Sequence, residues 1–203
     1  MTDRRIASTT LDHLLTEVKA CSICEVHLPH GPRPVVHMSS SAKVLIVGQA
    51  PGRRVHETGI PWNDPSGDRL RRWLNVSREQ FYDESRIAIM PMGFCYPGTG
   101  KSGDLPPRKE CAEQWHQRLL EQLPEIELTL LIGQYAQQYY LQHYPGNKKL
   151  SLTSRVQQWQ DYLPQYLPLP HPSPRNQLWL KKNPWFDDAV VPHLQKITQG
   201  LIG

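Results

Sequence analysis

One histidine is fixed between prolines in a way that suggests a ligand. The stretch LPLPHPSPRN, residues 167–176, contains four prolines and follows an aromatic, polar segment. Proline fixes φ and removes a backbone donor, so the chain around His171 is stiff. Such stiffness is typical of a turn after a strand, and it also suits a histidine that must meet a ligand at a fixed position. Both interpretations stay open from these residues alone.

Four cysteines form a second group that could do chemistry. Cys21 and Cys24 have the C-x2-C spacing, while Cys95 and Cys111 bracket a later segment. Four thiolates that include one C-x2-C pair suit a tetrahedral soft-metal site, either zinc or a 4Fe-4S cluster. Unpaired buried cysteines are the alternative, and disulfides are disfavoured because we expect a cytoplasmic protein.

A glycine-rich segment imitates a phosphate-binding loop. CYPGTGKSGDL, residues 95–105, contains the G-K-S of a P-loop. However, Cys95 occupies the first glycine position, and Pro106 and Pro107 interrupt the helix that must follow. We therefore interpret the segment as a mobile basic loop in which Lys101 can touch a phosphate. The chain contains neither G-x-S-x-G nor H-E-x-x-H, which weakens serine hydrolase and zinc protease interpretations.

The elements that must position these residues alternate along the chain. Apolar runs predict strands within residues 44–47, 85–94, 127–132 and 165–169, and apolar spacing predicts helices over 8–20, 67–76, 108–123 and 134–144. This order predicts an α/β protein, a three-layer α/β/α sandwich with a central four-stranded parallel sheet, formed by one domain over residues 1–203. Ligands bind such sheets at the carboxyl ends of the strands.

Composition adds weaker constraints. No apolar run is long enough for a membrane helix, and no apolar segment follows the charges of the N-terminus, so we expect a cytoplasmic monomer without a membrane partner. The formal net charge of +4 suits a polyanionic partner. Basic residues gather with tryptophan in DRLRRWL and WLKKNPW. Solvated charged faces explain these groups equally well.

Three motifs together resemble the uracil-DNA glycosylase superfamily. VGQAPG follows the first predicted strand, ETGIPWNDPSG comes shortly after it, and HPSPRN follows the last strand. The cysteine spacing is similar to that of the iron-sulfur families 4 and 5, and HPSPRN is similar to the motif of the single-strand-selective monofunctional uracil glycosylases. The resemblance spans nearly the whole chain. It implies single- or double-stranded DNA as partner, base flipping and monofunctional hydrolysis of an N-glycosidic bond in base excision repair.

The resemblance also implies roles for individual residues. His171 would stabilise the negative charge of the departing base. Asp64 would be the catalytic carboxylate, as in family 5, although an aspartate before Pro65 also suits a turn. Gln49 stands where family 4 has glutamate, and an amide can position water but cannot accept its proton. The four cysteines would hold a structural 4Fe-4S cluster.

Further residues are expected to contact the base and the DNA backbone. Trp62 would stack on the flipped base, and the other base-binding residues would be Gly48, Ala50, Met92 and Phe94. Phosphates would be held by Lys101 and by the backbone N–H groups of Ser173, Arg175 and Asn176.

Two features leave the substrate open. Pro91 occupies the position at which family 4 reads uracil with an asparagine, so the base could be uracil, hypoxanthine, xanthine or another lesion. Together with Gln49, it also motivates an alternative function, a catalytically silent module that binds DNA or nucleotides. The residues Leu178, Trp179 and Leu180, beside Lys181 and Lys182, could form a wedge that fills the vacated base stack. Alternatively, a plain amphipathic helix could pack Trp179 and Trp185 inward.

Overall fold

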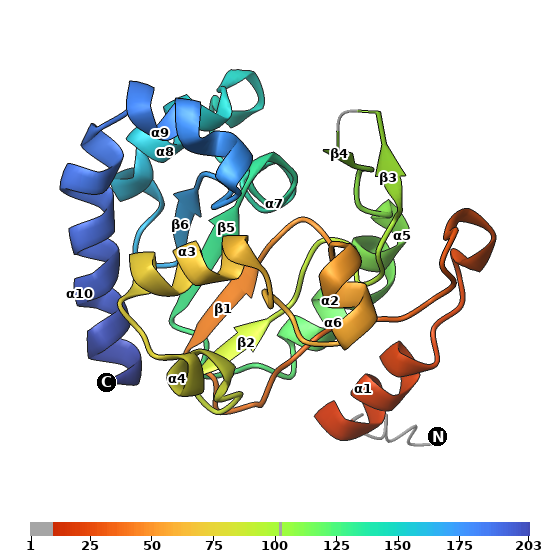
Figure 1. The fold of residues 1–203 in the computed structure, drawn as a ribbon. Helices are drawn as coiled ribbons and strands as arrows, with labels where there is room; N and C mark the ends of the chain where they lie inside the picture. Colours follow the sequence, from red (N-terminus) through yellow and green to blue (C-terminus); the bar gives the residue numbers. More distant parts are fainter. Residues whose placement is uncertain (1–9, 102) are drawn as a thin grey trace.

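A parallel four-stranded sheet lies at the centre of the computed structural model, which describes residues 10–101 and 103–203 (Figure 1). The strands are β1 (Val44–Val47), β2 (Ile87–Ile89), β5 (Leu128–Ile132) and β6 (Tyr166–Leu169), in the order β2-β1-β5-β6. Residues 8 and 9 of the first predicted helix lie outside the described residues, and the rest of it forms α1 (Leu11–Lys19).

Side chains of β1 show why the sheet is covered on both faces. Val44 and Ile46 pack into one hydrophobic core, whereas Leu45 and Val47 pack into the other. The first core is covered by α3 (Pro65–Leu74), α4 (Arg78–Tyr82), α8 (Leu152–Gln157) and α10 (Val191–Ile202), and the second by α1, α6 (Gln117–Leu120) and α7 (Gln134–Tyr140). Alternating strand residues thus bury both faces, and the predicted three-layer α/β/α sandwich is confirmed.

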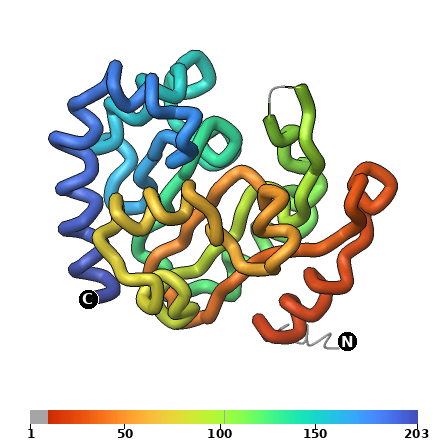
Figure 2. Tube along the Cα trace, viewed as in Figure 1, coloured from red at the N-terminus to blue at the C-terminus, as the bar shows by residue number. Residues whose placement is uncertain are grey.

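The remaining elements are short and lie mainly in the connections. They are α2 (Arg53–Thr58), α5 (Lys109–Cys111), α9 (Gln177–Lys182), the 3-10 turns at Glu25–His27, Asn147–Lys149, Trp159–Tyr162 and Pro174–Asn176, and the π-helical turns at Ala112–His116 and Phe186–Val190. The single helix predicted over residues 108–123 is therefore three consecutive segments. Figure 2 shows α1 and α10 at opposite sides of the molecule.

The glycine-rich segment after β2 is a small hairpin. Its strands β3 (Thr99–Gly100) and β4 (Gly103–Asp104) pair antiparallel. No helix follows until Lys109, which agrees with the rejection of a P-loop. Within the described part of the chain, no helix is both long and apolar enough to cross a membrane.

Backbone hydrogen bonds tie together the loops that leave the carboxyl ends of the strands. Met92 N–H donates to Gly48 O at 2.9 Å, Gly93 N–H donates to Gln49 O at 3.0 Å, and Gly133 N–H donates to Leu169 O at 2.9 Å. These bonds continue the strand pairing past the sheet, so neighbouring loops have a fixed relative position.

Candidate active site

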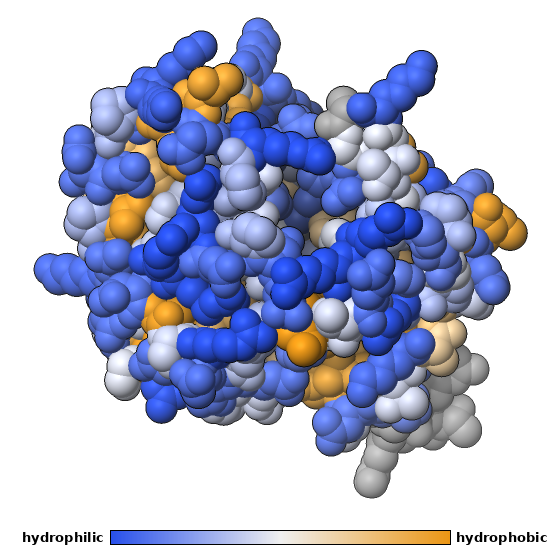
Figure 3. Space-filling model, viewed as in Figure 1, coloured by the Kyte–Doolittle hydropathy of each residue, from blue (hydrophilic) through white to orange (hydrophobic). Residues whose placement is uncertain are grey.

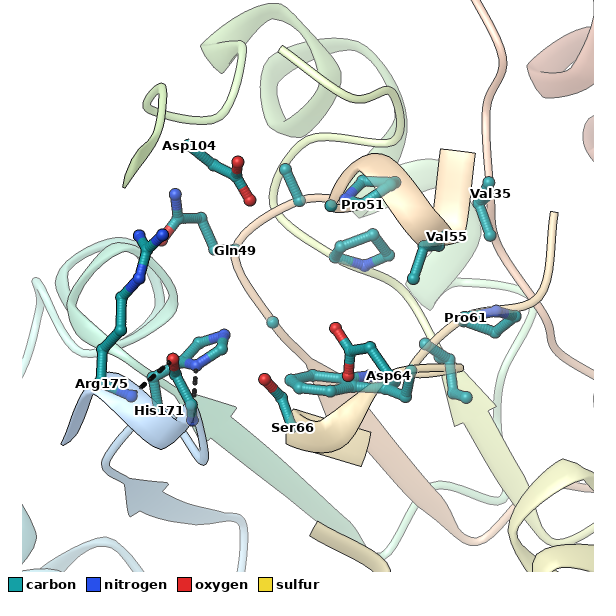
Figure 4. Close-up of a pocket in the computed structure, with 17 residues that line it drawn as sticks. Val35, Gln49, Pro51, Val55, Pro61, Asp64, Ser66, Asp104, His171 and Arg175 are labelled. Atoms are coloured by element: carbon teal, nitrogen blue, oxygen red, sulfur yellow. Dashed lines mark hydrogen bonds between the residues drawn. The ribbon is translucent and has the colours of Figure 1, made fainter. Parts of the chain in front are cut away.

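A cavity of about 270 Å³ lies at this edge of the sheet. Figure 3 shows a hollow with a mostly hydrophilic rim on this face, and Figure 4 shows the side chains around the cavity. Its volume is near the lower end of small-molecule sites. The wall is apolar at Val35, Val55, Pro61, Ile89 and Pro91, and its remaining residues are Gly48, Gln49, Ala50, Pro51, Gly52, Trp62, Asp64, Ser66, Asp104, His171, Ser173 and Arg175.

Trp62 presents its ring to this cavity from an unusual backbone conformation. Its φ is 55°, a value that is rare for a bulky residue. Tyr82 Oη donates to Pro61 O at 2.9 Å, and the buried Arg71 Nη1 donates to Trp62 O at 3.3 Å. The ring rests against Gly48, where a Cβ atom would lie 2.8 Å from it. The expected base-stacking residue is therefore held at the cavity by its neighbours.

Gly67 in α3 packs against the Trp62 backbone, as Gly48 packs against the Trp62 ring. Replacing Gly67 tests this contact. A Cβ atom there would lie 1.7 Å from Trp62 O. We expect Gly67→Ala to destabilise the protein by about 3 kcal/mol through overpacking. Gly200→Ala is the matched control because nothing lies within 4 Å of its Cβ position in α10, so alanine should stabilise by about 0.5–1 kcal/mol. Urea unfolding measures both, and equal effects would contradict the contact.

Asp64 begins α3 and lines the cavity. Its Oδ1 accepts the Gly67 N–H at 2.8 Å, the geometry of a helix N-cap. The turn-forming role and the predicted site role therefore coexist, because the same carboxylate is a wall of the cavity and acts electrostatically on His171.

His171 is the polar group opposite, and its tautomer is defined. Ser173 N–H donates to His171 Nδ1 at 3.1 Å, so in the neutral ring the hydrogen is on Nε2. Burial lowers the pKa of His171 below its ordinary value of 6.5, while the Asp64 charge opposes this shift. The ring is therefore neutral at pH 7 and lies 5.7 Å from the Trp62 ring, centroid to centroid. In Figure 4 its free edge points towards the cavity.

The backbone N–H groups of HPSPRN that are predicted to hold phosphates have partners within the turn. The three N–H groups concerned are used inside the loop: Ser173 donates to His171 Nδ1, Arg175 donates to Ser173 Oγ at 3.2 Å, and Asn176 donates to Ser173 O at 2.9 Å. These N–H groups therefore build the turn, and their contact with phosphates stays a prediction.

Side chains of this turn hold His171 instead. Asn176 Nδ2 donates to His171 O at 2.8 Å. Arg69 on α3 donates to Ser173 O at 3.1 Å and to Gln177 Oε1 at 2.9 Å. Arg69 therefore connects the helix that begins at Asp64 with the turn that carries His171, a contact that nothing in the local sequence indicated.

Gln49 lies at the cavity but is engaged with the hairpin. Its Nε2 donates to Leu105 O at 3.2 Å. Beside it, the hairpin residue Asp104 points its carboxylate towards the same space (Figure 4). Asp104 and Ser66 are wall residues that the sequence interpretation missed. Gly48 and Ala50 line the cavity as expected, and Lys101 is exposed in the hairpin turn.

Met92 and Phe94 do not line this cavity, although they were expected to bind the base. Both are buried in the core on the α1 side of the sheet, and the Phe94 ring stacks on His116 with centroids 5.6 Å apart. Pro91 does line the cavity, and its carbonyl faces His116 Nε2 at 3.1 Å. Side chains alternate along the chain from β2 onwards, so Ile89 and Pro91 line the cavity while Met92 and Phe94 face the core on the α1 side.

His116 makes the stability of the protein depend on pH. It is buried, it bonds to Tyr140 Oη and Pro91 O, and burial lowers its pKa from 6.5 to about 4. Between these values the unfolded state binds the extra proton, so the free energy of unfolding falls as the pH falls. We expect a loss of about 3 kcal/mol from this group between pH 7 and pH 4.

His116→Phe isolates that contribution from the other histidines. At pH 7 the variant should be about 2 kcal/mol less stable, because Tyr140 and Pro91 lose a buried hydrogen-bond partner. Its stability should then fall less steeply towards pH 4. Urea unfolding at pH 7, 5 and 4 checks this, and parallel pH curves for variant and wild type would contradict the assignment.

The four cysteines lie near one another, where the loop after α1 meets the segment after β2. Each of Cys24, Cys95 and Cys111 is buried and free, and their thiols lie within electrostatic range of one another and of the half-buried Cys21. Phe94 N–H donates to Cys111 Sγ at 3.4 Å. Burial raises the pKa of Cys95 to about 11 and that of Cys111 to about 12. Thiolates in this position need a compensating cation, which fits a metal-binding role.

Among residues 10–101 and 103–203, no three His, Cys, Asp or Glu side chains are grouped closely enough for one metal ion. The four-cysteine metal site therefore stays a prediction, for zinc and for a 4Fe-4S cluster alike.

Fold and site define an α/β protein with a ligand-sized cavity at the carboxyl edge of its parallel sheet. An aromatic ring, a neutral histidine and a carboxylate surround a narrow cavity at the carboxyl edge of a parallel sheet, the usual ligand position of such folds. The family model of the uracil DNA glycosylase superfamily matches residues 36–195, and the chain belongs to this superfamily.

Proposed function

We propose that this protein is a monofunctional DNA glycosylase that flips a damaged base, uracil or another deaminated base, and hydrolyses its N-glycosidic bond in base excision repair. Superfamily membership supports a glycosylase-type role with DNA as partner. One observation carries the proposal: a neutral His171 with a fixed tautomer lines the same narrow cavity as the Asp64 carboxylate.

The proposed chemistry follows from the charges that develop. As the glycosidic bond breaks, negative charge gathers on the base and the sugar becomes cation-like. His171 Nε2–H would donate to a carbonyl oxygen of the base, and a donor fixed in advance needs no reorganisation during the reaction. The Asp64 carboxylate would stabilise the cation-like sugar, and the Trp62 ring would stack on the base.

Charges near the cavity support DNA as the partner. Exposed cations stand on α2 (Arg53 and Arg54), in the hairpin turn (Lys101) and on the HPSPRN turn (Arg175). Cations in such positions can contact phosphates. Leu178 on α9 is 71% exposed, whereas Trp179 packs against Trp185 with ring centroids 5.8 Å apart. Leu178 is therefore our candidate for the wedge that fills the vacated stack.

An oligonucleotide panel tests the proposed function. Single- and double-stranded DNA carrying uracil, hypoxanthine, xanthine or a mismatch is incubated with the protein, and abasic sites are counted after alkaline cleavage. We expect abasic sites for at least one deaminated base and none in undamaged DNA. An absence of abasic sites on every substrate, together with tight DNA binding, would favour the silent module. Pro91 is the observation behind that alternative, because its side chain offers no hydrogen bond in the cavity wall.

We further propose that the four cysteines hold a structural 4Fe-4S cluster that joins the loop after α1 to the segment after β2. Excision needs no electron transfer, so the group would act on folding. Iron and sulfide analysis with visible absorbance of anaerobically purified protein tests this. Four irons per chain would support it, whereas zinc without iron would exclude it.

A further inference from the structure

We propose that Asp104, on the hairpin, is the group that accepts the proton of the attacking water. This inference rests on the proposed glycosylase function and adds a second carboxylate to it. Hydrolysis needs a proton acceptor, and the Gln49 amide cannot serve as one. Among the side chains that line the cavity, the carboxylates are Asp64 and Asp104.

The position of Asp104 relative to two adjoining hollows favours it. A second hollow of about 310 Å³ opens beside the first, and Asp104 and His171 line both, whereas Asp64 lines only the first. The scissile bond joins base and sugar, so with the base in the first hollow it must lie where the two hollows meet. A water that attacks the sugar carbon is then within reach of Asp104.

The contacts around the Asp104 carboxylate leave it able to accept a proton. Asp104 Oδ1 has a long contact of 3.4 Å with Thr99 Oγ1, and its Oδ2 lies 3.5 Å from where a Cβ atom on Gly52 would stand. By contrast, Asp64 Oδ1 is committed to the helix cap. Asp104 is also exposed, so a proton taken from water can pass directly to solvent.

The hairpin that carries Asp104 is held over the cavity from two sides. Gln49 Nε2 donates to Leu105 O at 3.2 Å. From the opposite wall, the Arg175 guanidinium lies against the backbone of Gly103, with Nη1 2.3 Å from the position that a Cβ atom there would occupy. Because Gln49 Nε2 is engaged, its Oε1 is the atom that would hold the water, and the amide acts as a positioning group.

The proposed reaction begins with attack of a water molecule on the sugar. The water oxygen bonds to the sugar carbon C1′, and one of its protons passes to Asp104. The C1′–N bond breaks and its electron pair leaves with the base, whose carbonyl is held by His171. Asp104 then returns the proton to solvent, and the free base takes up a proton from solvent. The product is an abasic sugar.

The proposed role of Asp104 predicts that removing its charge slows excision without weakening DNA binding. A carboxylate at the mouth repels DNA phosphates, so Asp104→Asn should bind an uncleavable 2′-fluoro oligonucleotide as tightly as wild type or more tightly. Its single-turnover excision rate on the best of the uracil, hypoxanthine and xanthine oligonucleotides should fall at least about 100-fold. Because the site is open, added formate should restore the rate about tenfold or more, and Asp104→Glu should retain part of it.

Asp161→Asn is the matched control. It removes the same charge from an exposed residue just before β6, at the opposite edge of the sheet, and it should excise at the wild-type rate. Asp104→Asn excision within threefold of wild type, loss in proportion to DNA binding, or loss that neither formate nor Asp104→Glu repairs would overturn the role while the glycosylase function stands. Failure of the wild type on all three bases would overturn the glycosylase function and this role with it.

Discussion

Replacing His171 with alanine should lower the single-turnover excision rate about 10²–10³-fold, the usual cost of a donor aimed at developing negative charge. The loss should be in the chemical step, because the DNA contacts that we propose come mostly from other residues. His171→Gln is the informative companion, since its amide can donate a hydrogen bond but lacks the fixed geometry that Ser173 gives the imidazole. We expect it to recover part of the rate.

The pH profile distinguishes this role from a structural one. Burial lowers the pKa of His171, so the ring stays neutral down to below pH 6.5. Protonation of His171 at lower pH would place a hydrogen on Nδ1, against the Ser173 N–H that donates to it. The wild-type excision rate should therefore be constant near pH 7 and fall only below pH 6.5. His171→Ala should lack this acid limb. A full-rate variant, or an unchanged acid limb, would contradict the assignment.

Local sequence signals predicted the frame of this site well. The apolar runs at β1, β2, β5 and β6 are buried on both faces, and that is the property that makes a central parallel strand recognisable. HPSPRN and the Trp62 loop could be found for a similar reason. The backbone constraints in both segments are local, because they come from prolines and glycines that are visible in the sequence.

Side-chain direction after a strand was harder to predict. Met92 and Phe94 follow β2, but whether they face the cavity or the core depends on register, and a shift of one residue exchanges the two faces. Asp104 was missed for a different reason. Its place at the cavity comes from long-range contacts of the hairpin with Gln49 and Arg175. The one available signal was a carboxylate in a glycine-rich loop beyond a strand end.

Asp64→Asn is the second large effect that we expect, with excision reduced about 10²–10³-fold, the usual cost of removing an electrostatic stabiliser of the transition state. Asparagine caps a helix as well as aspartate does, so α3 should keep its N-cap and the free energy of unfolding should change little. Single-turnover kinetics and urea unfolding of the same preparation separate the two roles of this carboxylate. Asp64→Ala should lose the cap as well and be about 1 kcal/mol less stable.

Two comparisons decide whether the Asp64 charge acts in the cavity. Ser77→Ala removes the N-cap of α4, outside the cavity, so it should cost a similar stability and leave excision intact. The Asp64 charge also raises the pKa of His171. Without it that pKa falls further, and the acid limb of the residual activity should move to lower pH. Activity loss in Ser77→Ala as large as in Asp64→Asn would indicate that helix capping, rather than charge, explains the effect. An acid limb that stays in place would contradict the electrostatic effect of Asp64 on His171.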